Sequence, residues 1–218
     1  MRARLHEEWD DVLDFWFPEG ADLTIDAQTH RTHWRWRMQG GADDAIIARF
    51  SDLTGQAARG DLDHWARDPQ GRLALIIVLD QFSRSVWRDD VRAFAQDPHA
   101  LALTLAGISN GQYQDLETPW FRIVFGLPLG HCEGPDHLQR VDMLIDLREG
   151  IAAAAPHHLR PIYGSLADQA RKVRKVVAAF GRHPHRNAIL NRASTAAEQA
   201  YIADGQFPHR QAFRGETD

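Results

Sequence analysis

The stretch that most constrains the fold is GRLALIIVLDQFSRSVWR, residues 71–88, because its first half is apolar on every side. A helix that is apolar all round belongs in the interior of a protein. A buried strand is the alternative for LALIIVL, residues 73–79, taken alone. We favour a helix, because the pattern continues beyond this run and the neighbouring segments have helical periodicity. The stretch therefore predicts a central helix surrounded by other helices.

Elsewhere, apolar residues recur at three- and four-residue steps, as in amphipathic helices. Pro and Gly residues end these segments, connections are short, and hairpin signals are lacking. The chain is therefore predicted to be all-α, with about nine or ten helices in antiparallel pairs and a tetratricopeptide-repeat-like superhelix. The predicted helices cover residues 5–17, 26–38, 43–59, 62–67, 71–88, 98–110, 115–125, 135–148, 163–180 and 196–204.

Three local features refine this assignment. Asp97 before Pro98 is predicted to be the N-cap of the helix that follows. Thr195 and Glu198 have the spacing of a capping box, which marks the start of the last helix. Residues 149–161 are predicted to form a surface excursion between two helices.

The bulk composition indicates a soluble globular protein. With 218 residues, the chain suits one domain over residues 1–218. Its formal net charge is −5 and its arginines are scattered among acids, so general nucleic-acid binding is not expected. No apolar run is long enough to span a bilayer, and the N-terminus lacks a signal-peptide pattern. We expect a cytoplasmic location, which agrees with Cys132 as the single cysteine.

A first polar cluster ends the central helix. Asp80, Arg84 and Arg88 are four residues apart, and Gln81 lies beside Arg84, so all four share one face. A buried carboxylate requires a partner, and we expect Asp80 to meet an arginine. The cluster is either an ion-pair network that joins helices or part of a binding site.

A second cluster lies in PLGHCE, residues 128–133, which is predicted to be non-helical. His131 and Glu133 could form a metal-ligand pair or an acid/base pair. Alternatively, Glu133 caps the helix that Pro135 opens. Cys132 is interpreted as a packing residue rather than a nucleophile.

The third cluster is FGRHPHRNAILNR, residues 180–192. Only His183 and His185 could ligate a metal here, and a site needs three or four ligands, so a metal is not indicated. The planar guanidinium groups of this segment suit carboxylates or phosphates. Alternatively, these arginines pair with Asp80 and Glu133 of this protein. His185 is predicted to open a short helix whose N-terminus would favour an anion. The candidate ligand-binding residues of this segment are Arg182, Arg186, Asn187 and Arg192.

In this order and spacing, LALIIVLDQFSRSVWR, AFAQDPHAL, GLPLGHCE and FGRHPHRNAILNRASTAAE resemble the bacterial family of unknown function DUF924. VLDFWF and ARGDLDHWA extend the resemblance over nearly the whole chain. The resemblance implies an all-helical fold similar to tetratricopeptide-repeat proteins, but no reaction. Its polar pattern falls on Asp80, Gln81, Arg84, Arg88, His131, Glu133, Gln139, Arg182, His185, Arg186, Asn187, Arg192 and Thr195.

The sequence departs from that family pattern at several positions. Ser83 stands where a proline is usual and Gly130 where a glutamate is usual. An aromatic residue, a glycine and a histidine are commonly found at the positions of His183, Asn191 and Val173. If the family's chemistry needs the missing acid or histidine, this member differs in activity or substrate.

The leading hypothesis is a polar pocket to which three distant segments contribute and which binds a small anionic molecule. Arg84, Arg88, Arg182 and Arg186 would hold the anion. His131, Glu133 and His185 would be the acid/base candidates, Asp80 would orient an arginine, and Thr195 would serve as a helix cap. The rival hypothesis is a helical adaptor for a peptide or protein, in which the polar network is purely structural. A third hypothesis is a metal-dependent hydrolase that uses His131, Glu133 and His185. No cofactor is identified by the sequence.

Overall fold

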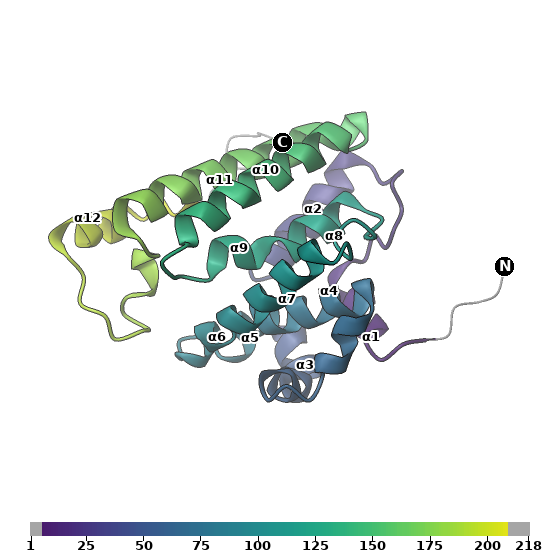
Figure 1. The fold of residues 1–218 in the computed structure, drawn as a ribbon, viewed down its shortest axis with the longest axis horizontal. Coiled ribbons are helices and arrows are strands. Elements are labelled where there is room, and N and C mark those ends of the chain that lie inside the picture. The colour runs from purple at the N-terminus through teal and green to yellow at the C-terminus, as the bar shows by residue number, and fades with distance from the viewer. Residues whose placement is uncertain (1–5, 209–218) are drawn as a thin grey trace.

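The computed structural model describes residues 6–208, and among these no strand occurs, which confirms the all-α prediction (Figure 1). The α-helices are α1 (Asp10–Trp16), α2 (Ala27–Met38), α3 (Asp43–Ala58), α4 (Pro69–Ile77), α5 (Ser83–Val86), α6 (Arg92–Ala95), α7 (Asp97–Ser109), α8 (Pro119–Phe125), α9 (Leu127–His131), α10 (His137–Ala154), α11 (Arg160–Phe180) and α12 (Ala196–Asp204). Short 3₁₀ turns are η1 (Asp63–Arg67), η3 (His157–Leu159) and η4 (Pro184–Arg186), and η2 (Val78–Phe82) is a π-helical turn.

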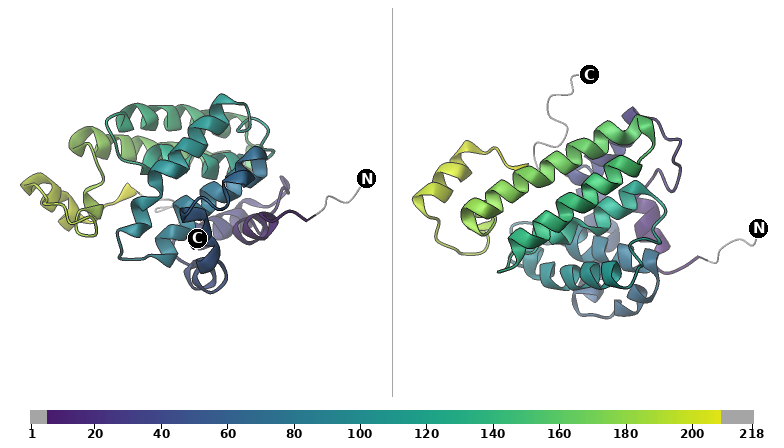
Figure 2. Two further views of the ribbon diagram at one scale, coloured as in Figure 1. Left: turned by 60° about the horizontal axis from the view of Figure 1, so that its bottom comes forward. Right: turned by 45° about the horizontal axis from the view of Figure 1, so that its top comes forward.

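The two longest helices, α10 and α11, form an antiparallel pair that lies along one side of the molecule (Figures 1 and 2). The predicted excursion over residues 149–161 is wrong for its first half, because α10 continues to Ala154. Alanine is the best helix former, so the run of alanines extends the helix until Pro156 prevents further extension. The tetratricopeptide-repeat-like superhelix and the single-domain assignment stay predictions.

The central segment is buried as predicted, and residues 71–80 are each less than a tenth exposed. It is not one regular helix, however. Helix α4 widens into the π-helical turn η2 before α5 begins, and the hydroxyl of Ser83 donates to the carbonyl of Leu79 at 2.7 Å. Such wide turns often occur at functional sites. This one places the Asp80 carboxylate inside the protein.

Several predicted boundaries are wrong. The first helix begins at Asp10, and Leu5 lies outside the described residues. The helix predicted over residues 115–125 begins only at Pro119, and Thr118 is its N-cap. The segment predicted to be non-helical around His131 contains α9. Instead of the short helix expected from His185, the structure has only the 3₁₀ turn η4. The segment after this turn includes Asn191, whose backbone is left-handed with φ of 50°. The capping box of Thr195 and Glu198 is confirmed.

Tight packing between α7 and α8 yields a first prediction. A Cβ at Gly107 would lie 2.4 Å from Cζ of the buried Phe125 ring. We expect Gly107→Ala to lower the free energy of unfolding by about 1–3 kcal/mol, measured by urea denaturation, because the ring has no room to move. Gly150→Ala on α10 is the matched control, since no atom beyond the neighbouring helix backbone lies within 4 Å of its Cβ position. It should be neutral or stabilising by up to about 1 kcal/mol. Equal effects of the two variants would contradict the prediction.

None of the helices in residues 6–208 is both long and apolar enough to cross a membrane.

Candidate functional site

A cavity of about 690 Å³ lies between the α10–α11 pair and the segments around α5, α6 and η4. The apolar part of its wall includes Trp16, Trp34, Met38, Leu127, Leu144, Val173, Val176 and Ile189. The ionisable groups on the wall include Arg37, Arg84, Arg88, Arg148, His131, His183, His185 and Arg186. An apolar pocket with a few convergent polar groups is the usual form of a small-molecule site.

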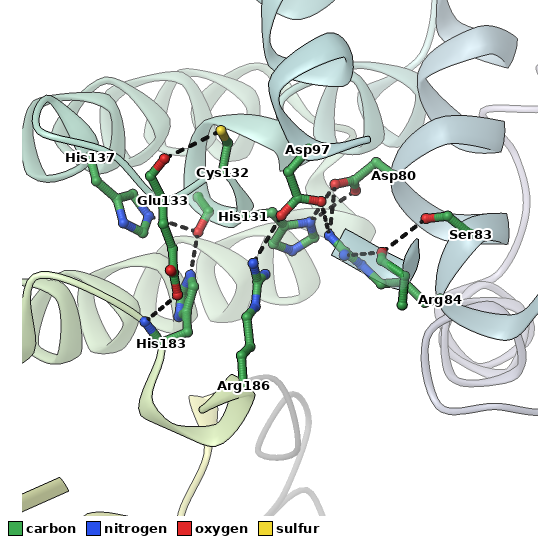
Figure 3. Close-up of polar contacts among 12 residues, drawn as sticks. Asp80, Ser83, Arg84, Asp97, His131, Cys132, Glu133, His137, His183 and Arg186 are labelled. Atoms are coloured by element: carbon green, nitrogen blue, oxygen red, sulfur yellow. Dashed lines mark hydrogen bonds and ion pairs between the residues drawn. The ribbon is translucent and has the colours of Figure 1, made fainter. Parts of the chain in front are cut away.

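Asp80 and His131 form a buried carboxylate–histidine pair at this wall (Figure 3). His131 Nδ1 lies 2.9 Å from both oxygens of Asp80, which is completely buried, whereas the imidazole is 31% exposed. A carboxylate can only accept, so Nδ1 carries a proton and donates. Burial by itself would raise the pKa of Asp80, but His131, Arg84 and Gln81 outweigh it and hold the pKa below its ordinary value. The pair thus fixes the orientation of the imidazole.

Asp97 lies between two arginines from distant segments (Figure 3). Its carboxylate accepts from Arg84 at 2.6 Å and from Arg186 at 2.9 Å. Both guanidinium groups also stack on the ring of Phe94, at 4.6 and 4.4 Å from its centroid. One carboxylate and one aromatic ring therefore hold the two cations together at the cavity wall.

The contacts of Asp80 and Asp97 differ from the sequence predictions. Asp80 meets Arg84 at 3.4 Å, as expected of a buried acid, but the imidazole of His131 lies nearer to it. Asp97 does not cap α7. The helix begins at Asp97 itself, after Gln96, and the carboxylate contacts arginines instead of backbone N–H groups.

Glu133 connects residues 181–192 to the end of α9 through a hydrogen bond and an ion pair. It accepts from the backbone N–H of His183 at 2.8 Å and forms an ion pair with Arg192. Burial would raise its pKa, but these hydrogen bonds lower it, so Glu133 is held as an anion. His183 donates its Nε2 proton to the carbonyl of Gly130 at 2.9 Å, and burial keeps its pKa well below the ordinary value. Glu133 is not among the described residues that line the cavity.

The remaining candidates fall into two groups. Gln81 and His185 lie on the cavity wall, as does Arg88, which pairs with Asp43 at the exposed rim. The others lie outside the lining. Arg182 forms two hydrogen bonds with Glu198, Asn187 bonds Ser194 and Arg192, and Gln139 is exposed on α10. Within residues 6–208, no group of three or more His, Cys, Asp or Glu is arranged to hold a metal ion.

Comparison with known families gives a match over residues 12–206 to the model of a bacterial protein of unknown function, DUF924. The chain belongs to the DUF924 family. A solved structure of a protein of unknown function from Agrobacterium tumefaciens is similar, with 30% sequence identity and a TM-score of 0.68 over 90% of this chain and 97% of the other. No curated protein matches the chain.

In this DUF924 member, two departures from the expected pattern lie at the cavity. Val173 is part of the wall, where the resemblance implies a histidine. Gly130 packs so closely on α10 that a Cβ there would lie 2.9 Å from Cδ2 of Leu144. An acid at position 130 would not fit without movement of Leu144. The cavity of this DUF924 protein therefore has fewer titratable groups than the resemblance implies.

Sequence reasoning missed four charged residues that matter here: Asp97, Glu19, Arg37 and Arg148. Arg37 lines the cavity and forms a buried ion pair with Glu19, which also lies 3.2 Å from His30 Nδ1. No local pattern connects these residues. Arg148 could have been found, because it continues the apolar stripe of Val141, Leu144 and Ile145 along α10.

Proposed function

We propose that this protein binds a small anionic molecule in the 690 Å³ cavity and that the Asp80–His131 pair transfers a proton to or from it. The observation that carries the proposal is the orientation of His131. Its Nδ1 is occupied by a buried carboxylate, its Nε2 makes no hydrogen bond to any described residue, and the side chain lines the cavity. An imidazole oriented by a carboxylate is a recurrent form of general base.

The arginines supply the attraction for an anion. Arg186 is 5% exposed, lines the cavity and leaves its buried Nε without a hydrogen-bond partner. Arg84 lies beside it through Asp97. We assign Glu133, Arg182, Asn187 and Arg192 to positioning of residues 181–192, which carry Arg186 and His185. His185 is the second acid/base candidate, because its ring lines the cavity and lies 5.5 Å from that of His183.

A helical adaptor for peptides is less well supported. That function would need a continuous exposed apolar or aromatic surface. The exposed large apolar side chains of residues 6–208 lie on separate segments instead: Leu23, Ile47, Val91, Met143 and Ile202. The cytoplasmic location and the lack of general nucleic-acid binding remain predictions beside this proposal.

The first test measures thermal stability with a panel of carboxylates, phosphates and divalent metal ions. A ligand of the native state at a hundredfold excess over its Kd stabilises by about 2.7 kcal/mol, so binding should raise the Tm clearly. At least one anion should raise the Tm of wild type without changing the Tm of Arg186→Met. If no anion shifts wild type and Arg186→Met only lowers the Tm, the residues around Arg186 are purely structural.

The second test separates binding from proton transfer. Each anion that binds is incubated with the protein in D₂O and followed by NMR for exchange or conversion. His131→Asn should still bind the anion but lose turnover by roughly 10²–10⁴-fold, the usual contribution of a general acid or base. Undiminished turnover in this variant would contradict the role of His131.

A further inference from the structure

Arg148 on α10 is a buried arginine without an acidic partner among the described residues. It is 4% exposed and lines the cavity. Its Nη1 donates to the carbonyl of Leu166 at 2.7 Å and to Oε1 of Gln169 at 3.2 Å. Its Nε is buried without a hydrogen-bond partner. Burial lowers the pKa of Arg148 to about 10, so the side chain is still charged at neutral pH. A buried charge without a counter-charge is unfavourable, and the cavity is where a compensating anion could bind.

Arg72 shows how this protein holds a buried arginine for structure alone. Arg72 is 8% exposed, does not line the cavity, and donates from all three nitrogens, to Gln112, Leu103 and Ala66. In Arg148 only Nη1 is used by described residues, which leaves the edge formed by Nε and Nη2. That edge presents two parallel N–H groups, the arrangement that binds a carboxylate through both oxygens.

The surroundings of Arg148 indicate what else the ligand contains. Leu144, one turn earlier on α10, contacts the backbone of Gly130, which precedes His131. Arg148 therefore lies roughly 6 Å further along the helix axis than Leu144, which packs against the residue before His131. Val173, one turn after Gln169 on α11, continues this wall together with Leu127 and Trp34. Leu144 and Val173 thus form an apolar part of the wall of the cavity that Arg148 and His131 also line.

We infer that Arg148 binds the carboxylate of a ligand whose apolar body lies along Leu144 and Val173 and whose other end reaches His131. This inference rests on the proposed function and specifies its substrate class. A single guanidinium compensates one negative charge, which suits a carboxylate. A phosphate monoester carries about 1.5–2 negative charges at neutral pH, which is more than this one guanidinium compensates.

Hexanoate and 4-phenylbutyrate at 10 mM are suitable probes, compared with their primary amides and with hexyl phosphate. The readouts are the Tm and the Kd from calorimetry. Wild type should bind at least one of the carboxylates and neither amide. Arg148→Met should weaken that binding by roughly 30-fold or more, because a buried charged partner is lost. Arg174→Met, in an exposed pair with Asp142 outside the cavity lining, should bind like wild type.

The stability of Arg148→Met tests the inference independently. Methionine fills a similar volume without a charge, so the variant should be at least as stable as wild type while binding is lost. A markedly lower Tm with unchanged carboxylate binding would make Arg148 structural and overturn the inference. Failure of both carboxylates to bind wild type would also overturn it.

The outcomes distinguish this inference from the proposed function. Binding of hexyl phosphate alone, lost in Arg186→Met and kept in Arg148→Met, would overturn the role of Arg148 and leave the anion pocket supported. Carboxylate binding that depends on Arg148, with no exchange or conversion of any bound carboxylate, would support the ligand class and contradict the role of His131.

Discussion

Asp97→Asn should lower the free energy of unfolding by about 3–5 kcal/mol, because it removes the negative charge between two partly or fully buried arginines. Arg84 and Arg186 meet the two oxygens of Asp97, and Arg186 is 5% exposed. Without that carboxylate, two like charges would face each other beside Phe94, with Asp80 left as the acid near Arg84. The loss should therefore exceed that of a single hydrogen bond.

Urea denaturation at neutral pH measures this effect. Asp142→Asn is the matched control, since it removes a carboxylate from an exposed pair with Arg174 and should change stability by less than about 1 kcal/mol. The double variant Asp97→Asn/Arg84→Met should recover part of the loss, because one of the two uncompensated cations is removed. A loss as small as in the control would mean that solvent already screens the two arginines.

Glu19→Gln should also lower the free energy of unfolding at neutral pH by about 3–5 kcal/mol, because it leaves Arg37 as an uncompensated buried cation. Glu19 is 7% exposed and Arg37 is 3% exposed. Burial would raise the pKa of Glu19, but hydrogen bonds and charges from His30 and Arg37 lower it to about 2. The carboxylate is thus bound far more strongly as an anion than as an acid.

The pH dependence follows from this depressed pKa. A carboxylate whose pKa falls from 4.5 to about 2 on folding stabilises the native state fully above pH 4.5, and this contribution is lost as the pH falls through about 2. The stability difference between wild type and Glu19→Gln should therefore be constant from pH 5 to 7 and shrink toward pH 2, measured by thermal unfolding. Glu149→Gln, in an exposed pair with Arg171, should show almost no difference at any pH. A difference that grows on acidification would contradict the assignment.

Periodicity was sufficient to predict most helices, because an amphipathic helix repeats its apolar residues whatever it packs against. It failed where context decided the outcome. The alanines before Pro156 extend α10 because nothing interrupts the helix there. The π-helical turn at Val78–Phe82 has no local sequence signal, since its extra residue is accommodated by packing and by the hydroxyl of Ser83.

The candidate site was predictable in residue type but not in pairing. Ionisable groups on apolar segments need partners, which singled out Asp80, Arg84, His131 and Arg186. The contacts in the structure join residues that are far apart in the chain: the members of one pair are separated by 51 positions and those of another by 89. No sequence pattern encodes such separations. Asp97 was missed because an aspartate before a proline is equally typical of a helix cap.

The π-helical turn has a consequence for how the site could change by insertion or deletion. Each residue of a regular helix advances the chain by about 100° around the axis, since a turn takes 3.6 residues. The wide turn takes up one extra residue, so deleting one residue between Val78 and Phe82 would leave α5 in nearly its present orientation. If the same residues formed a regular helix throughout, α5 would be rotated by about that angle relative to α4, and Arg84 would turn away from Asp97 and Phe94. The alignment of the arginines with the cavity therefore depends on this wide turn, independently of the core beneath it.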